Sequence, residues 1–201
     1  EVYCTIGNYN QAKEYHEKAL IVSKKIYGEE HADVARSYNH LGKVYWKLQQ
    51  NSQAKEYNEK ALIILKNIYD EEHAHIARSY HYLGCHYFSL GQYDQAQEYT
   101  EKALYIQKKI YGEEHADVAA SYNNLGVDHR CLGQYDQAKE YDEKALYIRK
   151  KINGEEHADV AASYNNLGVI IVTLDSTIKQ KNTTRRHCSS GKRFTVRNML
   201  M

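Results

Sequence analysis

Histidine and glutamate recur at matching positions along the sequence, and both residue types can bind metals or transfer protons. Each of four histidines follows a glutamate pair: His31, His73, His115 and His157. Stacked units would hold successive copies about 10 Å or more apart, whereas ligands of one metal lie about 2 Å from it. The glutamates precede predicted helix N-termini, where the helix dipole favours negative charge. We therefore predict a structural role for these histidines and no bound metal.

Other catalytic patterns point the same way. His73 and His75 form the one close histidine pair, without cysteine or carboxylate ligands that would converge on it. No nucleophile is accompanied by a base, and no phosphate-binding glycine-rich loop is present. The sequence predicts that the protein is not an enzyme and needs no cofactor.

The chain repeats itself with a period of 42 residues. The block Gly-Glu-Glu-His-Ala-Asp-Val-Ala begins at positions 28, 112 and 154, and a variant of it begins at Asp70. A fixed period of this size is typical of repeat arrays. We divide the array, 1–174, into a partial unit 1–27, full units 28–69, 70–111 and 112–153, and a half unit 154–174. We interpret the start, inside an incomplete unit, as a fragment boundary.

Each unit is predicted to form two helices. Val34, Tyr38, Leu41 and Tyr45 follow one another at intervals of three or four residues, and the second half of the unit shows the same spacing. A glycine also recurs inside every first helix, at positions 42, 84, 126 and 168. An interior glycine costs about 1 kcal/mol relative to alanine, so its recurrence predicts close contact between the paired helices.

The motifs that fill this frame resemble the tetratricopeptide repeat. They are Leu-Gly in the first helix, then Gly-Gln-Tyr-Asp-Gln-Ala, then Lys-Ala-Leu. The usual period is about 34 residues, and the longer period with its Glu-Glu-His-Ala junction is similar to the repeats of kinesin light chain and nephrocystin-3. The resemblance implies an all-α superhelix, or α-solenoid, of stacked antiparallel helix pairs. It also implies a protein-protein interaction scaffold or adaptor whose first helices line a concave groove that binds extended peptides.

Composition and charge agree with an array of this kind. The net charge is +1, and no run approaches the roughly 20 apolar residues of a membrane span. No signal-peptide pattern opens the chain, so we expect no membrane and a cytoplasmic location. The four cysteines have neither the spacing of the repeat nor a Cys-x-x-Cys pair, which favours reduced thiols.

Residues 175–201 depart from the repeat. They hold seven lysines and arginines against the single acid Asp175. We predict a basic, divergent and disordered tail, either the end of a truncated reading frame or, as an alternative, a nucleic-acid patch at Arg185-Arg186 and Lys192-Arg193. The acidic balance of the repeats argues against nucleic acid as the main partner.

Comparison of the units in register predicts the ligand-binding positions. Residues that differ between units at one register are free to select a ligand, and three such registers avoid the Leu/Tyr stripe of the first helix: Trp46, Phe88, Arg130 and Val172; Lys43, Cys85, Val127 and Val169; Lys47, Ser89, Cys131 and Thr173. Arg36 and Arg78 add positive charge near the start of the same helices. The variable second-helix positions Asn58, Thr100 and Asp142 are predicted to lie on a tolerant convex surface.

The resemblance implies that three asparagines at one register bond to a peptide backbone: Asn39, Asn123 and Asn165. His81 occupies the same register in the second full unit and would interrupt this ladder of asparagines. The predicted groove comprises Arg36, Asn39, Lys43, Trp46, Lys47, Arg78, His81, Phe88, Asn123, Arg130 and Asn165. Basic side chains beside Trp46 and Phe88 favour an acidic peptide with an aromatic or large apolar anchor. Packing between repeats is the competing interpretation for these two aromatic residues.

Three further hypotheses follow from the sequence. Residues 112–127 and 154–169 are identical, which fits a generic spacer as well as a binding site. The array could instead be the sensor segment of a larger protein that also has a nucleotide-binding domain. Because both ends cut through a helix pair, we also predict fraying or self-association there.

Overall fold

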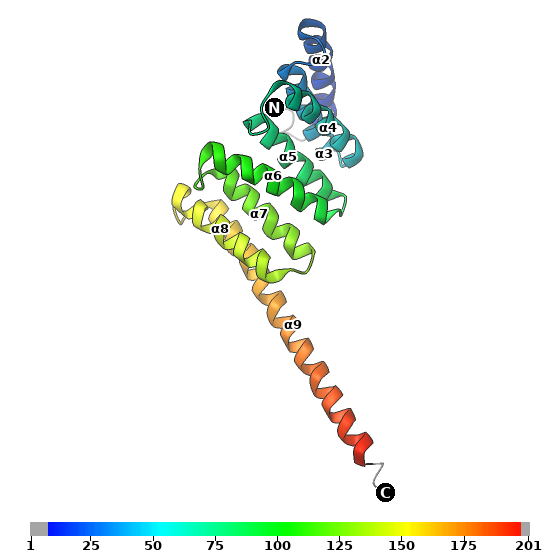
Figure 1. Cartoon of the computed structure of the whole chain (residues 1–201), viewed down its shortest axis with the longest axis vertical. Coiled ribbons are helices and arrows are strands. Elements are labelled where there is room, and N and C mark those ends of the chain that lie inside the picture. Colours follow the sequence, from blue (N-terminus) through cyan, green and yellow to red (C-terminus); the bar gives the residue numbers. More distant parts are fainter. Residues whose placement is uncertain (1–7, 198–201) are drawn as a thin grey trace.

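A computed structural model describes residues 8–197, and all regular secondary structure within that range is helical. Figure 1 shows the helices stacked along one long axis. Their bounds are α2 Tyr9–Tyr27, α3 Ala32–Lys47, α4 Asn51–Ile68, α5 Ala74–Ser89, α6 Tyr93–Tyr111, α7 Ala116–Cys131, α8 Tyr135–Asn153 and α9 Ala158–Arg197. The predicted all-α solenoid of helix pairs is confirmed.

Consecutive helices pack against one another throughout the stack. α3 pairs with α4, α5 with α6 and α7 with α8, and each pair also contacts the next. First helices of neighbouring units touch as well, α3 with α5 and α5 with α7. The contacts between first helices create the surface that holds the candidate site.

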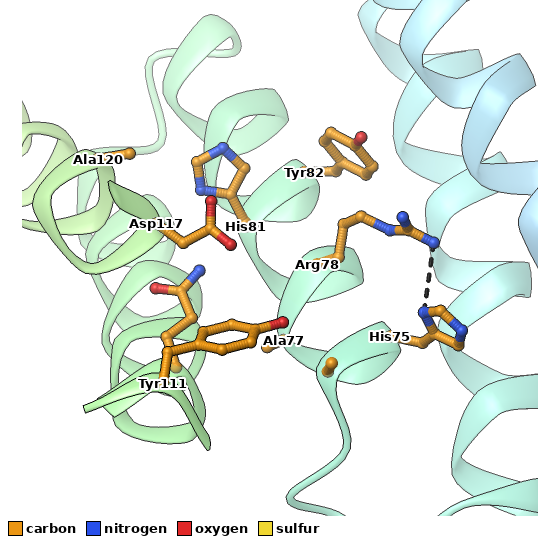
Figure 2. A pocket seen from close by; sticks show the side chains of 10 residues that line it. His75, Ala77, Arg78, His81, Tyr82, Tyr111, Asp117 and Ala120 are labelled. Atoms are coloured by element: carbon orange, nitrogen blue, oxygen red, sulfur yellow. Dashed lines mark hydrogen bonds between the residues drawn. The ribbon is translucent and has the colours of Figure 1, made fainter. Parts of the chain in front are cut away.

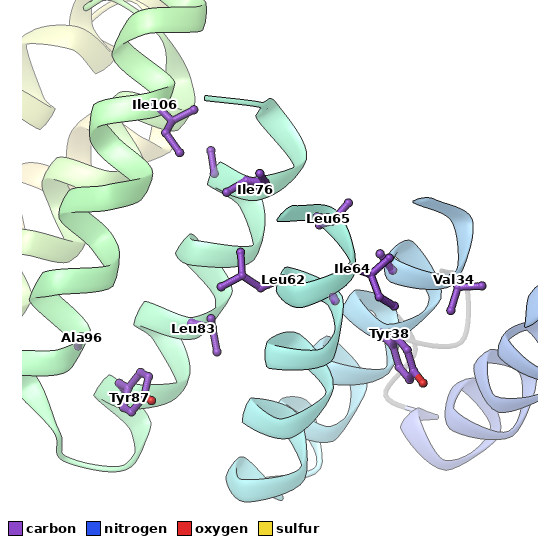
Figure 3. Close-up of a cluster of buried hydrophobic side chains, with 13 residues drawn as sticks. Val34, Tyr38, Leu62, Ile64, Leu65, Ile76, Leu83, Tyr87, Ala96 and Ile106 are labelled. Atoms are coloured by element: carbon purple, nitrogen blue, oxygen red, sulfur yellow. The ribbon is translucent and has the colours of Figure 1, made fainter. Parts of the chain in front are cut away.

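The main apolar core runs across the unit boundaries. Figure 3 shows Val34 and Tyr38 of α3 with Leu62 and Leu65 of α4, continuing to Ile76 of α5. Val34 and Ile76 are fully buried. Burying such a side chain stabilises the fold by about 1.5–3 kcal/mol, and here the gain depends on the adjacent unit. The units therefore support one another, as expected for a solenoid.

Close helix contact at the interior glycines, predicted from the sequence, is present in three units. A Cβ at Gly84 would lie 2.6 Å from Oγ1 of Thr100, and a Cβ at Gly126 would lie 2.5 Å from Oδ1 of Asp142. A Cβ at Gly42 would collide with the side chain of Asn58. At Gly168, in α9, nothing lies within 4 Å of the added Cβ.

This contact overturns the prediction for the second helices. Asn58, Thr100 and Asp142 do not lie on a convex surface, since their side chains are only 0%, 2% and 1% exposed. Each faces the interior glycine of its own unit. The sequence interpretation was wrong because it took polar, variable residues to be exposed, whereas the missing Cβ of glycine leaves buried space for them.

The recurrent histidines begin the first helices. In each of the four, Nδ1 accepts a hydrogen bond from the backbone N–H two residues later, at 3.1–3.2 Å. An N-cap acceptor of this kind satisfies one of the free N–H groups at a helix start. Three of the rings also stack on a tyrosine at the end of the preceding helix or directly after it, with centroids 4.4, 3.8 and 4.3 Å apart at Tyr27, Tyr69 and Tyr111. Their role at the junction is structural, as predicted.

The C-terminal region differs from the sequence prediction. We expected the half unit to end at residue 174 and a disordered tail to follow, but α9 continues without a break to Arg197. Figure 1 shows this helix leaving the stack. The proposed basic patch falls where side chains are not described, and residues 1–7 of the partial unit lie outside the described range.

A helix that spans a membrane must be both long and apolar. Within residues 8–197, no helix combines the length and apolar character needed to cross a bilayer.

Candidate functional site

Two adjoining pockets lie along α5 where it faces α7. The first, which we call the Arg78 pocket, has a volume of about 370 Å³ and is lined by Ala74, His75, Ala77, Arg78, His81, Tyr82, Gln107, Tyr111, Asp117 and Ala120. The second, which we call the Trp46 pocket, has a volume of about 270 Å³ and is lined by Trp46, Gly84, Cys85, Phe88, Ser89, Thr100, Asn124, Val127 and Asp128. Most lining residues of both pockets belong to first helices, and the second helix α6 contributes Gln107 and Tyr111 to one and Thr100 to the other.

The Arg78 pocket is polar and carries both signs of charge. Figure 2 shows Arg78 with His75 on one side and His81 beside Asp117 on the other. The Arg78 guanidinium lies 3.3 Å from Nδ1 of His75. Burial, together with the charge of Arg78, lowers the pKa of His75, so at neutral pH that imidazole is uncharged and does not repel the guanidinium. Arg78 is exposed and offers a donor to an acidic group.

His81 is the titratable group that the protein encloses most in this pocket. Burial lowers its pKa, and the neighbouring Asp117 carboxylate opposes that effect. Its Nδ1 is buried without a hydrogen-bond partner among the described residues. A neutral ring with one unused nitrogen can bond to a peptide amide or carbonyl group, according to its tautomer.

The Trp46 pocket has aromatic walls and a polar floor. Nε1 of Trp46 donates to Oγ of Ser89 at 2.9 Å, which ties α3 to α5. Phe88 packs against Tyr93, with ring centroids 5.4 Å apart. At the floor, Oγ1 of Thr100 donates to the carbonyl of Ala96 at 2.8 Å. Trp46 thus contacts the next repeat and also lines the cavity, so the two interpretations given above are compatible for Trp46, whereas Phe88 packs against Tyr93 within its own unit.

Asp128, like Asn124, lines this pocket although the sequence analysis did not single it out. Its side chain is 3% exposed, and its Oδ2 has no hydrogen-bond partner among the described residues. Burial raises its pKa to about 7. The same register holds Val44, His86 and Ile170 in the other units. The presence of both apolar and ionisable residues at one register is the signal that could have pointed to Asp128.

The predicted site residues separate into three groups. Arg78 and His81 line the first pocket, and Trp46 and Phe88 line the second. The other seven lie outside both pockets: Arg36, Asn39, Lys43, Lys47, Asn123, Arg130 and Asn165. Arg36 is paired with Asp33, and Nζ of Lys47 lies 4.4 Å from the ring centroid of Trp46.

Burial of Asn39 contradicts its place in the predicted asparagine ladder, whereas the role of the half-buried Asn123 stays a prediction. Asn39 is 2% exposed, donates to Oγ of Ser79 at 3.0 Å and accepts from Nδ2 of Asn58 at 2.5 Å. Oδ1 of Asn123 accepts from Arg149 at 3.2 Å and from Asn166 at 3.0 Å. These amides are used in contacts between helices. Tyr82 and Asn124, each one position later along the helix than the predicted ladder, also line the pockets, as does the ladder position His81.

Comparison with known proteins agrees with this architecture. The tetratricopeptide repeat family matches residues 1–67, 44–109, 75–146 and 117–172. The chain belongs to the tetratricopeptide repeat family. No curated protein matches the sequence significantly. Within the described residues, no group of three or more histidine, cysteine or acidic side chains gathers as a metal site would require.

Solved structures show the same fold. BtubC (BKLC) from P. vanneervenii has a TM-score of 0.77 at 26% identity, covering 92% of this chain and 73% of its own. A Podosopora anserina protein named for kinesin light chain, with nearly identical TPR-like repeats, gives 0.74 at 26%, covering 90% and 85%. The apo form of RapI gives 0.67 at 23% identity, covering 87% and 64%. The likeness to kinesin light chain predicted from the junction motif is thus confirmed.

Proposed function

We propose that this protein is a non-enzymatic, cytoplasmic interaction scaffold whose first-helix face binds an extended segment of a partner protein. The tetratricopeptide repeat is a fold typical of protein-protein interaction scaffolds, and curved solenoids present long concave binding surfaces. The observation that carries the proposal is the placement of two chemically different pockets along one helix, α5.

The spacing of the pockets suits an extended peptide. His81 and Phe88 are seven residues apart on α5, which corresponds to about 10 Å at 1.5 Å per residue. An extended peptide covers that distance in about three residues at roughly 3.3 Å each. Side chains three residues apart in the ligand could therefore occupy both pockets.

The chemistry of the pockets supports a pattern for the ligand. Arg78 favours an acidic side chain in the first pocket, since a guanidinium bonds well to a carboxylate. Trp46 and Phe88 favour a large side chain with an apolar body in the second. The proposed ligand therefore carries an acid about three residues from a large anchor.

A randomised peptide library, screened against the full chain, tests the proposal. We expect enriched peptides with this spacing, and we expect Arg78→Glu to weaken their binding at least tenfold because it places like charges together. Lys139→Glu provides the control, since Lys139 is an exposed residue of the second helix α8. Absence of enriched peptides, or equal loss in both variants, would reject the groove as the binding site.

A further inference from the structure

The Trp46 pocket is rich in hydrogen-bond acceptors and lacks a cation. None of its lining residues is lysine, arginine or histidine. Asp128 contributes a carboxyl group, while Thr100 and Asn124 contribute further oxygen atoms. The Thr100 hydroxyl already donates its proton to the carbonyl of Ala96, so what it offers to an occupant is an acceptor.

Burial of the Asp128 carboxyl group without a hydrogen-bond partner is unfavourable in free energy. Its side chain is 3% exposed, and Oδ2 has no partner among the described residues. A buried acceptor without a partner costs about 1–3 kcal/mol, more if it is charged. A donor brought into the pocket would remove that penalty, and a cationic donor would remove most of it.

The walls of the pocket suit the stem and the charge of a cationic side chain. Trp46 and Phe88 provide aromatic surface, and Val127 adds an apolar contact. A long methylene stem packs on such walls, and an ammonium is attracted to a tryptophan face by about 0.5–2 kcal/mol. The protein itself places Nζ of Lys47 4.4 Å from the Trp46 ring centroid, although Lys47 does not line the pocket.

We infer that the Trp46 pocket selects a lysine or arginine side chain of the partner, whose cationic end pairs with Asp128 and whose stem lies between Trp46 and Phe88. This inference deepens the proposed function and rests on it. The ligand pattern then becomes an acid at the Arg78 pocket and a base about three residues away at the Trp46 pocket. The anchor is large and partly apolar, and it carries a charge at its end.

The single tryptophan of the chain makes occupancy of this pocket measurable. We would titrate the full protein with the capped pentapeptide Ala-Ala-Lys-Ala-Ala, and separately with its norleucine counterpart, while recording Trp46 fluorescence. The titration is made at pH 8, where Asp128, with its pKa of about 7, is mostly ionised. We expect the lysine peptide to bind at least tenfold more tightly, since a charge-assisted hydrogen bond is worth about 1.5–3 kcal/mol.

Two matched variants decide the assignment. Asp128→Asn keeps the size of the side chain and removes its charge, so we expect it to abolish the lysine preference. Asp142→Asn removes another buried acid whose oxygens have no hydrogen-bond partner among the described residues, but which does not line the pocket, and the preference is expected to remain. Because Asn58 occupies the same register as Asp142, asparagine is already accommodated there.

The outcomes separate this inference from the proposed function. Equal binding of the two pentapeptides, no fluorescence response to either, or a lysine preference that survives Asp128→Asn would overturn the cation pocket. If library peptides still bind and are lost in Arg78→Glu, the groove stands without the cation pocket. A far-ultraviolet circular dichroism melt of each variant shows whether a lost preference reflects unfolding. If Asp128→Asn unfolds, Asp128→Val replaces it, because valine already occupies the same register at the buried Val44.

Discussion

The interior glycines allow a sharp test, because one register holds glycine in four different surroundings. A Cβ at Gly42 would collide with Asn58, including its Cγ at 2.7 Å, whereas at Gly168 nothing lies within 4 Å. We therefore expect Gly42→Ala to destabilise the protein and Gly168→Ala to stabilise α9. The two substitutions make the same chemical change, so only the packing differs.

The magnitudes follow from three contributions at Gly42. Alanine gains about 1 kcal/mol from helix propensity, while overpacking costs about 1–3 kcal/mol. Displacing Asn58 also disrupts its bonds to Asn39, at 2.5 Å, and to His86, at 2.7 Å. Each bond is worth about 0.5–1.5 kcal/mol. Gly42→Ala is thus expected to lose about 1–5 kcal/mol, and Gly168→Ala to gain about 1 kcal/mol.

Urea unfolding followed by circular dichroism measures the loss in Gly42→Ala, and amide hydrogen exchange in α9 measures the gain in Gly168→Ala. Asn58→Ala supplies the second half of a double-mutant cycle. The three nearest atoms to the added Cβ all belong to Asn58, so in that background Gly42→Ala should become neutral or stabilising. A loss at Gly42 that persists without the Asn58 side chain, or the same sign of effect at both glycines, would refute the packing argument.

Three other predictions concern the polar groups between helices. Asn39→Ala should lower the free energy of unfolding by about 1–3 kcal/mol, because it leaves Asn58 and Ser79 without their buried partner; unchanged stability in urea would contradict this. The pKa of Asp128 is raised to about 7 and that of His86 lowered to about 4, both by burial, from ordinary values of 3.8 and 6.5. The folded state thus binds the Asp128 proton more tightly than the unfolded state does. The stability gained by Asp128→Val should therefore grow from pH 4 to pH 8, towards an upper limit of about 4 kcal/mol. His86→Val removes the bond to Asn58, so it is compared by its slope: its stability relative to the parent protein should rise as pH falls from 7 to 4. Urea midpoints measured across this range would show these opposite slopes, and parallel slopes would refute the assignment. Finally, Arg149→Ala removes bonds at 2.7 Å to Oγ of Ser163 and at 3.3 Å to the carbonyl of Asp159, so hydrogen exchange at the start of α9 should accelerate while that of α5 does not.

Comparison of the units in register found part of the site, although it misplaced Asn58, Thr100 and Asp142. The register comparison selected Trp46, Phe88, Cys85, Val127 and Ser89 as variable positions away from the packing stripe, and all five line the Trp46 pocket. It succeeded because helical periodicity fixes which residues share a face of one helix. Their role in binding a ligand remains a proposal.

The sequence by itself determined the 42-residue period, the pairing of helices, the positions of close approach at the glycines and the junction histidines, because these depend on spacing along one chain. Tertiary structure alone decided which polar side chains are buried. Asn39 finds its partners 19 and 40 residues away, at Asn58 and Ser79. Asp128 becomes a pocket residue only when α3, α5 and α7 are side by side. Burial of a polar group depends on hydrogen-bond partners and on space supplied by other helices. Residue type alone would have led us to expect that these polar side chains are exposed.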